Sequence, residues 1–145
     1  MRVLLANNLN EIKTILNNFR DELPILKTSE EYRQNMSEKF IKYGNVLFVE
    51  EQESILGFVA FYANDLETKT AYISFIAVKN AFQKKGVGTL LLNSCEIQAQ
   101  KKGMNKIRLE VKKNNTNAQC FYKNHRFDFE CDASDDSFYM FKALE

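Results

Sequence analysis

Residues 71–92 constrain the fold more than any other part of the chain. They begin with an apolar run rich in Ile, Val, Phe and Tyr, which predicts a strand buried on both faces. They end in strong helix formers with apolar residues at helical spacing. Between these parts lie residues 83–88 (QKKGVG), whose two glycines allow a tight turn and close approach of a ligand to the backbone. A helix that begins there offers unpaired N–H groups and the positive end of its dipole to a phosphate or pyrophosphate.

Two well-known phosphate-binding patterns do not fit this segment. The Walker pattern requires Lys and then Ser or Thr after four variable residues and a glycine, whereas Gly88 is followed by Thr89 and Leu90. The dinucleotide-binding pattern requires a third glycine where this chain has Leu91. On these residues alone, an ordinary strand–turn–helix connection remains as good an interpretation as an anion site.

Length, charge and cysteine content exclude several classes of protein. A chain of 145 residues is most simply one domain, residues 1–145, and 20 basic against 19 acidic residues argue against charge-driven binding to nucleic acid. No segment approaches the ~18 apolar residues of a membrane span. The three cysteines have no metal-ligand spacing, and His125 is the only histidine, so we expect no metal. Reduced thiols fit a cytoplasmic protein.

Hydrophobic periodicity and capping residues predict eleven elements. Asn8 and Ser29 are expected to cap helices, and Gly44 and Gly103 to end them. The order β-α-α-β-β-β-α-β-α-β-β predicts an α/β protein with a mixed sheet, in which the strand–helix–strand unit at 71–111 supplies one parallel pair. The predicted strands are 1–5, 45–50, 54–62, 70–78, 106–111, 127–131 and 138–144, and the predicted helices are 8–19, 29–43, 86–102 and 116–124.

A second informative stretch is residues 110–127 (EVKKNNTNAQCFYKNHRF). Together with the glycine turn, it resembles the GNAT superfamily of N-acetyltransferases, which has a Q/R-x-x-G-x-G/A loop followed by an N-x-x-A-x-x-(F/L)-Y-x-x-x-G-F segment. The chain departs from this pattern at Arg126, where the family usually has glycine and where Arg at positive φ is disfavoured. The matching residues are Gln83, Gly86, Gly88, Asn115, Ala118, Phe121, Tyr122 and Phe127.

The resemblance implies the GNAT fold and acetyl-coenzyme A (acetyl-CoA) as cosubstrate. The pantetheine arm is expected to pair with the strand end formed by Ile76, Ala77 and Val78. Asn115 is expected to contact the cofactor, to cap the helix at 116–124, or to do both. The pyrophosphate is expected on the backbone of Gln83, Lys84, Lys85, Gly86, Val87, Gly88 and Thr89.

Two side chains are predicted to be catalytic. Tyr122 stands where the family places its general acid, although a core aromatic is the alternative. Glu110 lies in an L-E-V segment similar to that of ribosomal-protein alanine N-acetyltransferases, 12 residues before the tyrosine, and is the candidate base. Water could serve in its place, and Glu50 and Glu51 are weaker candidates.

The predicted function is direct transfer of acetyl from acetyl-CoA to a primary amine, small molecule or protein, through a tetrahedral intermediate. The alternative is a non-catalytic acyl-CoA sensor or interaction domain on the same fold. We expect no partners beyond acetyl-CoA and the amine acceptor, neither nucleic acid nor membrane, and a monomer or homodimer. The sequence does not name the amine.

Overall fold

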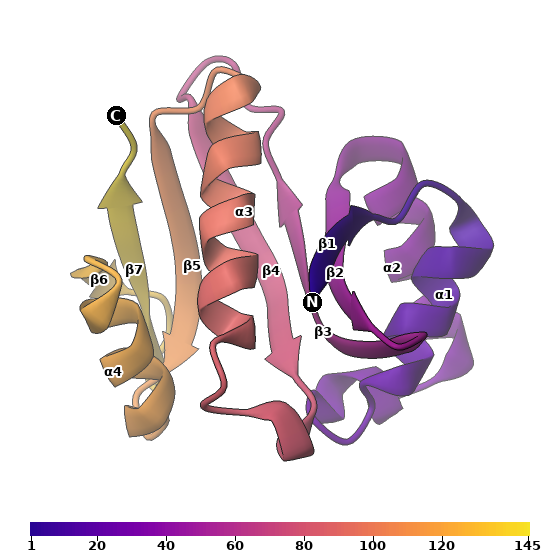
Figure 1. Cartoon of the computed structure of the whole chain (residues 1–145). Coiled ribbons are helices and arrows are strands. Elements are labelled where there is room, and N and C mark those ends of the chain that lie inside the picture. Colours follow the sequence, from indigo (N-terminus) through magenta and orange to yellow (C-terminus); the bar gives the residue numbers. More distant parts are fainter.

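A seven-stranded mixed sheet with helices on both faces forms the frame of the computed structural model, which describes residues 1–145 (Figure 1). The observed order of strands and helices confirms the predicted α/β fold. The elements are β1 (Arg2–Leu5), α1 (Leu9–Asn18), η1 (Pro24–Lys27), α2 (Glu30–Tyr43), β2 (Asn45–Glu51), β3 (Ser54–Tyr62), β4 (Thr70–Val78), η2 (Asn80–Phe82), α3 (Val87–Lys101), β5 (Lys106–Lys112), α4 (Thr116–Asn124), β6 (Asp128–Asp132) and β7 (Ser137–Ala143).

The strands lie in the order β1-β2-β3-β4-β5-β7-β6, so the last hairpin inserts β7 beside β5 and leaves β6 at the edge. Every neighbouring pair is antiparallel except β4 and β5, which confirms the single predicted parallel pair. The prediction that β4 is buried on both faces is wrong, because most of its residues beyond Ile73 are only partly buried. The reason is that this end of the strand borders an open cleft.

The parallel ladder between β4 and β5 is short. It pairs Thr70–Ile73 with Lys106–Leu109 and then stops. At that point β4 bulges against β3, because Ala60 pairs with Phe75 and the next residue pairs with Ile73, which leaves Ser74 as the extra residue. Beyond the bulge, the end of β4 pairs only with β3, and the end of β5 pairs only with β7.

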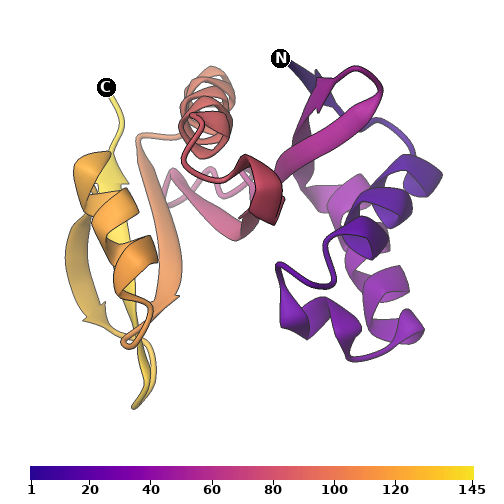
Figure 2. The same cartoon turned by 60° about the horizontal axis from the view of Figure 1, so that its bottom comes forward.

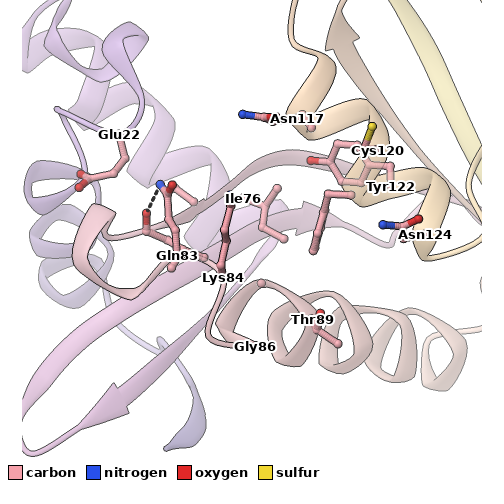
Figure 3. A pocket seen from close by; sticks show the side chains of 15 residues that line it. Glu22, Ile76, Gln83, Lys84, Gly86, Thr89, Asn117, Cys120, Tyr122 and Asn124 are labelled. Carbon is pink, nitrogen blue, oxygen red and sulfur yellow. Dashed lines mark hydrogen bonds between the residues drawn. The ribbon is translucent and has the colours of Figure 1, made fainter.

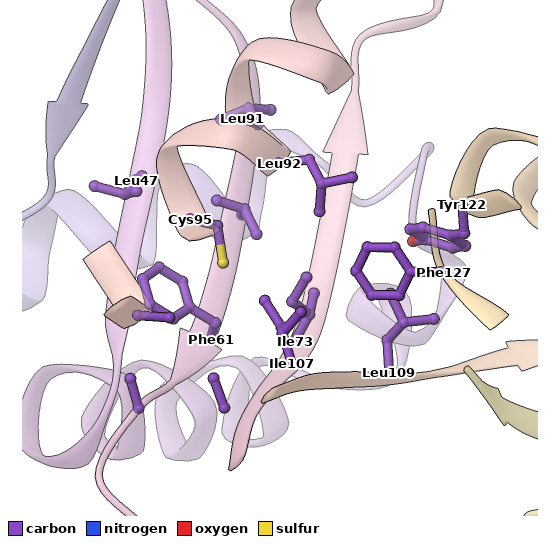
Figure 4. Close-up of a cluster of buried hydrophobic side chains, with 14 of the residues drawn as sticks. Leu47, Phe61, Ile73, Leu91, Leu92, Cys95, Ile107, Leu109, Tyr122 and Phe127 are labelled. Carbon is purple, nitrogen blue, oxygen red and sulfur yellow. The ribbon is translucent and has the colours of Figure 1, made fainter. Parts of the chain in front are cut away.

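Two hydrophobic clusters occupy the two faces of the sheet. Helices α3 and α4 pack on one face, where Leu91 and Cys95 meet Ile73 and Ile107 in the larger cluster (Figure 4). Helices α1 and α2 cover the other face at the N-terminal end of the sheet (Figure 2), around Phe40 and Phe58. Apolar residues that alternate along the central strands feed both clusters. None of the helices is both long and apolar enough to cross a membrane.

The helix ends follow the predicted caps with one exception. The Asn8 side chain accepts a hydrogen bond from Glu11 N at 2.9 Å, and Ser29 Oγ accepts one from Tyr32 N at 2.9 Å. Gly44 ends α2 as predicted, but with φ −119° and not in the left-handed conformation that the prediction assumed. Glycine is needed there for space, since a Cβ would lie 3.1 Å from the Phe40 ring and the Phe61 carbonyl oxygen.

Arg126 keeps the turn geometry that glycine would give. Its φ is 72°, its N–H bonds the Lys123 carbonyl at 3.0 Å, and Phe127 N bonds the Tyr122 carbonyl at 3.0 Å. These two bonds are those of a Schellman motif at the end of α4. The departure from the family pattern therefore changes the residue and not the turn, because Phe127 is anchored in the core.

Candidate active site

The connection from β4 to α3 exposes a run of unpaired backbone donors. No N–H group of residues 84–89 donates a hydrogen bond to another protein atom, and Leu90 is the first to do so, to Gly86 O at 3.0 Å. Lys84 and Gly86 both have left-handed backbone, with φ of 63° and 87°. Alternation of handedness at such a turn directs successive N–H groups to one point, and the dipole of α3 adds positive potential there. This arrangement is suited to a phosphate or pyrophosphate.

The two glycines of this turn have different roles. A Cβ on Gly86 would meet no atom within 4 Å, so its open side is available to a ligand. A Cβ on Gly88 would lie 3.2 Å from Phe121 Cζ, so this glycine lets the first turn of α3 pack against α4. Gln83 fastens the loop to the sheet, because its Nε2 donates to the Val78 carbonyl at 3.1 Å (Figure 3). The same Nε2 also donates to Asn80 Oδ1 at 3.2 Å.

A cavity of about 690 Å³ extends from this turn to α4, along the end of β4 (Figure 3). Nine predicted site residues line it, while Lys85, Val87, Asn115 and Glu110 do not. The full lining is Glu22, Ile76, Ala77, Val78, Gln83, Lys84, Gly86, Gly88, Thr89, Asn117, Ala118, Cys120, Phe121, Tyr122 and Asn124.

Three of the predicted cofactor residues lie elsewhere for structural reasons. Val87 is buried in the core with 1% of its surface exposed. The Lys85 ammonium lies over the Phe82 ring, 5.7 Å from its centroid. Asn115 caps α4, where its Oδ1 accepts a hydrogen bond from Ala118 N at 3.2 Å. The capping interpretation of Asn115 is therefore correct, and its contact with the cofactor stays a prediction.

Several lining residues were not predicted. Asn117, Cys120 and Asn124 share one face of α4 with Phe121, and their spacing of three and four residues is a signal that could have identified them. Glu22 has no such signal, because it comes from the connection between α1 and α2. Its side chain is only 8% exposed, lies 3.6 Å from the Lys79 ammonium, and leaves Oε1 without a hydrogen bond.

The end of β4 presents a free backbone edge toward the cleft. Lys79 N donates to the Leu56 carbonyl at 2.8 Å, which points toward β3. Because donor directions alternate along a strand, the groups of Val78 and Ile76 point to the opposite edge, where β5 has already diverged. The middle residue of the predicted pantetheine segment, Ala77, faces β3. The Val78 carbonyl is already bonded by Gln83, so an extended ligand can pair with both backbone groups of Ile76 and with the N–H of Val78.

Tyr122 brings a phenol to the inner end of the cavity. Its ring packs against Phe121 and Phe127, with centroids 5.4 and 5.6 Å apart, and only 8% of the residue is exposed. Its hydroxyl has no hydrogen-bond partner in the protein, although it is not among the fully buried polar atoms. Burial raises the pKa of Tyr122, so the phenol stays protonated at neutral pH. Tyr122 is therefore a core aromatic whose hydroxyl has no partner in the protein and remains free to donate a hydrogen bond.

Glu110 lies on the other face of the sheet from Tyr122. Leu109 and Val111 point into the cluster that contains Tyr122, so the carboxylate between them projects to the opposite side. There it accepts a hydrogen bond from Ser137 Oγ at 2.6 Å. Tyr72 is close, since burial first and the Glu110 charge next raise the pKa of its phenol.

The two weaker base candidates lie at the far end of β2. Glu50 is bonded by Arg2 at 2.7 Å, and Glu51 by the N-terminal ammonium at 3.2 Å. Neither lines the cavity. Glu110 does not line it either, so the cavity lining does not rank the three carboxylates.

The profile of the acetyltransferase (GNAT) family matches residues 12–128. The chain belongs to this family, and the match confirms the predicted family, fold and activity, that of an acetyl-CoA-dependent N-acetyltransferase. No curated protein sequence matches the chain.

Solved structures share the fold over nearly the whole chain. PaiA N-acetyltransferase from Thermoplasma acidophilum, solved with coenzyme A, is 19% identical with a TM-score of 0.79, covering 99% of each chain. YncA from Salmonella typhimurium, solved with its cofactor acetyl-CoA, is 17% identical with a TM-score of 0.79, covering 99% of this chain and 94% of the other. A ribosomal-protein alanine N-acetyltransferase from Escherichia coli is 15% identical with a TM-score of 0.78, covering 99% of this chain and 95% of the other.

Proposed function

We propose that Tyr122 and Glu110 carry out direct transfer of the acetyl group from acetyl-CoA to a primary amine. The observation that supports this most is the continuity of the site. Six unpaired N–H groups at the start of α3 open into a cavity that follows the free edge of β4 and ends at the Tyr122 phenol. Acetyl-CoA has an anionic pyrophosphate, an extended pantetheine arm and a terminal thioester. These parts require an anion site, a free strand edge and a proton donor, in this order.

The chain offers a place for each part of acetyl-CoA. The pyrophosphate would bind the N–H groups of residues 84–89, with the Lys84 ammonium adding charge. The pantetheine amides would pair with the N–H and C=O groups of Ile76, which leaves the Val78 N–H for the oxyanion. Asn115, or Asn117 two residues later, which lines the cavity, would contact the arm from α4. The thioester then lies where β4 and β5 diverge.

The reaction needs a neutral amine, a stabilised oxyanion and a protonated leaving group. Glu110 takes a proton from the amine, and the nitrogen attacks the thioester carbonyl. The N–H of Val78 faces the developing oxyanion. The C–S bond breaks as Tyr122 protonates the coenzyme A sulfur. Because Glu110 and Tyr122 lie on opposite faces, the amine and the leaving group can use separate sides of the same opening.

The charges around the site do not select the acceptor. The loop that holds Asp132, Asp135 and Asp136 could attract a cationic amine, but Asp132 lies 3.4 Å from Lys113 and Asp136 lies 3.2 Å from Lys112, so two of the three carboxylates are already paired. The related structures include an enzyme named for a ribosomal-protein alanine, which makes a protein N-terminus one acceptor class to test beside small amines. We also propose a cytoplasmic monomer or homodimer, in keeping with three unpaired cysteines.

The test is product formation with a panel of polyamines, amino acids and N-terminal peptides. Mass spectrometry of acetylated product is the better readout, because the exposed thiols of Cys120 and Cys131 would react with a thiol dye. Turnover with any amine, lost when acetyl-CoA is omitted, is the expected result. Tight binding of acetyl-CoA with no turnover on any amine would favour the non-catalytic alternative.

A further inference from the structure

Glu110 is one end of a row of four oxygen groups. Its Oε2 contacts Ser137 Oγ at 2.6 Å, Ser137 Oγ contacts Ser134 Oγ at 2.7 Å, and Ser134 Oγ contacts Asp136 Oδ1 at 2.7 Å. The row runs from the central strand β5, through the first residue of β7, into the loop before it. It therefore connects the candidate base with an exposed carboxylate at the surface.

The register of the sheet places Ser137 beside Glu110. Lys112 pairs with Ser137 and Glu110 pairs with Tyr139, so Ser137 is the diagonal neighbour of Glu110 on the same face. Ser137 is only 1% exposed. Its carbonyl accepts hydrogen bonds from Ala133 N at 3.0 Å and Ser134 N at 3.2 Å, which fixes the loop that carries the next hydroxyl.

The row has three oxygen–oxygen contacts but only two hydroxyl hydrogens, so one more proton is needed for every contact to be a hydrogen bond. When both carboxylates are ionised, they can only accept, and each serine brings one hydroxyl hydrogen. Ser137 donates to Glu110 and Ser134 donates to Asp136, so the contact between the two serines has no hydrogen. One added proton on Glu110 lets all three contacts become hydrogen bonds, each pointing toward Asp136.

From this geometry we infer that Ser137 and Ser134 form a proton relay. The relay removes the proton from Glu110 after this residue has deprotonated the acceptor amine. The inference rests on the proposed function of Glu110 as the base. The amine N–H bond breaks and an O–H bond forms on Glu110. The Ser137 hydroxyl turns toward Ser134, and the proton of Glu110 passes to Ser137, that of Ser137 to Ser134, and that of Ser134 to Asp136. Asp136 releases it to water, and Glu110 is an anion again.

When a bound acceptor covers the exposed side of Glu110, the groups packed around the carboxylate leave the two serines as the path by which its proton reaches water. Tyr72 on β4 and Tyr139 on β7 flank the carboxylate, and Arg108 on the same strand is held by Glu130 at 2.6 Å while it stacks on Tyr139 at 3.6 Å. At the outer end, the hydrogen bond from Ser134 and the Lys112 ammonium 3.2 Å away lower the pKa of Asp136, so this carboxyl group passes a proton on to water readily. Ser137 and Ser134 are positioning and relay residues and do not touch the substrate.

Two alanine variants separate the relay from simple support of Glu110. Ser137→Ala removes both the donor to Glu110 and the relay, whereas Ser134→Ala cuts only the relay and leaves the Ser137–Glu110 bond in place. We expect kcat to fall roughly tenfold in Ser137→Ala and roughly threefold in Ser134→Ala, each a part of the ~10²–10⁴-fold that a base contributes. The KM for acetyl-CoA should not change, because neither serine lines the cavity. Ser137→Thr, which keeps the hydroxyl, should restore most of the rate.

The decisive readout is the dependence of kcat on the fraction of D₂O, measured below the pKa of the amine. Several protons in motion give a curved dependence in the wild type, and Ser134→Ala should reduce the curvature, because only the protons moved by Glu110 and Tyr122 remain. Ser54→Ala, an exposed serine at the start of β3, is the control and should stay curved. Ser134 is exposed as well, so its variant is informative even where Ser137→Ala fails to fold.

The kinetic results distinguish failure of the relay from failure of Glu110 as the base. A Ser134→Ala enzyme with the kcat and the curvature of the wild type would overturn the relay, while a slow Glu110→Gln enzyme in the same assays would leave the proposed function intact. If Glu110→Gln is as fast as the wild type, the base and the relay are both wrong. A linear dependence in the wild type also overturns the relay.

Discussion

The hydroxyl of Tyr122 is the one polar atom on a ring that otherwise packs between Phe121 and Phe127. Tyr122→Phe removes that atom and keeps the packing. We expect kcat to fall by ~10²–10⁴-fold, the usual value of general acid catalysis, with the Kd of acetyl-CoA changed by less than about tenfold. Steady-state kinetics and calorimetry measure the two quantities. Tyr43→Phe makes the same chemical change on an exposed ring at the end of α2 and should have no effect. Wild-type turnover in a folded Tyr122→Phe enzyme would make this residue a core aromatic only.

Glu110 gives a second prediction for a single residue. If its carboxylate takes the proton of the amine, Glu110→Gln should lower the rate most at pH values below the pKa of the amine and flatten the acid limb of the pH–rate profile. The amide keeps the shape of the side chain and can still accept a hydrogen bond from Ser137. A pH–rate profile that does not differ from that of the wild type would assign the deprotonation to water.

Among the elements, the start of α3 and its end provide a matched pair of glycines. Gly86 has φ 87° and Gly103 has φ 90°, and a Cβ on either would meet no atom within 4 Å. Gly86→Val and Gly103→Val should therefore cost similar stability, on the order of 1–2 kcal/mol for a residue forced into left-handed backbone. Only Gly86→Val should weaken acetyl-CoA, by roughly tenfold or more, because its side chain occupies the space of the phosphates. Equal affinities in the two variants would argue against the anion site.

The edge strand β6 is tied to β5 by Glu130, which gives a prediction for pH. Its carboxylate accepts hydrogen bonds from Lys106 at 2.5 Å and from Arg108 at 2.6 Å. The bond from Lys106 first, and Arg108 next, lower the pKa of Glu130 below its ordinary value. A lowered pKa in the folded state adds stability above the unfolded pKa, and that stability is lost as the pH falls through the folded value. Glu130→Gln should thus be less stable at pH 7 by about 1 kcal/mol, since the site is partly solvated. The difference should vanish in acid, as urea unfolding at several pH values would show.

For the molecule as a whole, the reactivity of the three cysteine thiols tests where acetyl-CoA binds, and this test does not require the acceptor amine to be known. Cys120 lines the cavity, Cys131 is exposed elsewhere, and Cys95 is buried, where burial raises the pKa of its thiol. Alkylation should modify Cys120 and Cys131 readily and Cys95 only after unfolding. Saturating acetyl-CoA should slow modification of Cys120 and leave Cys131 unchanged, as peptide mass spectrometry would reveal. Equal protection of both exposed thiols would place the ligand elsewhere.

The sequence was sufficient for features that depend on neighbours along the chain. Strand and helix order, the caps at Asn8 and Ser29, and the glycine turn that leads into α3 all follow from local patterns. Features that depend on distant segments were not predictable. The extra residue Ser74 arises from a mismatch in register between β3 and β4, and the packing of Gly44 depends on Phe61. The contribution of Glu22 to the cavity requires the connection between α1 and α2 to lie beside η2, which no local pattern encodes.

Only four residue pairs join β4 to β5, and this has a mechanical consequence. The sheet therefore consists of two halves, β1 to β4 and β5 to β7, which meet at a seam between β4 and β5. Helix α3 follows β4 and precedes β5 in the chain, and it packs across this seam (Figure 1). In the proposed binding mode, the arm of acetyl-CoA would pair with the edge of β4 beyond the last of these pairs and would fill part of the seam. Substitutions that extend the pairing of the two strands would stiffen the empty protein and at the same time narrow the opening through which coenzyme A must leave. Stability and product release therefore oppose each other at this one place in the sheet.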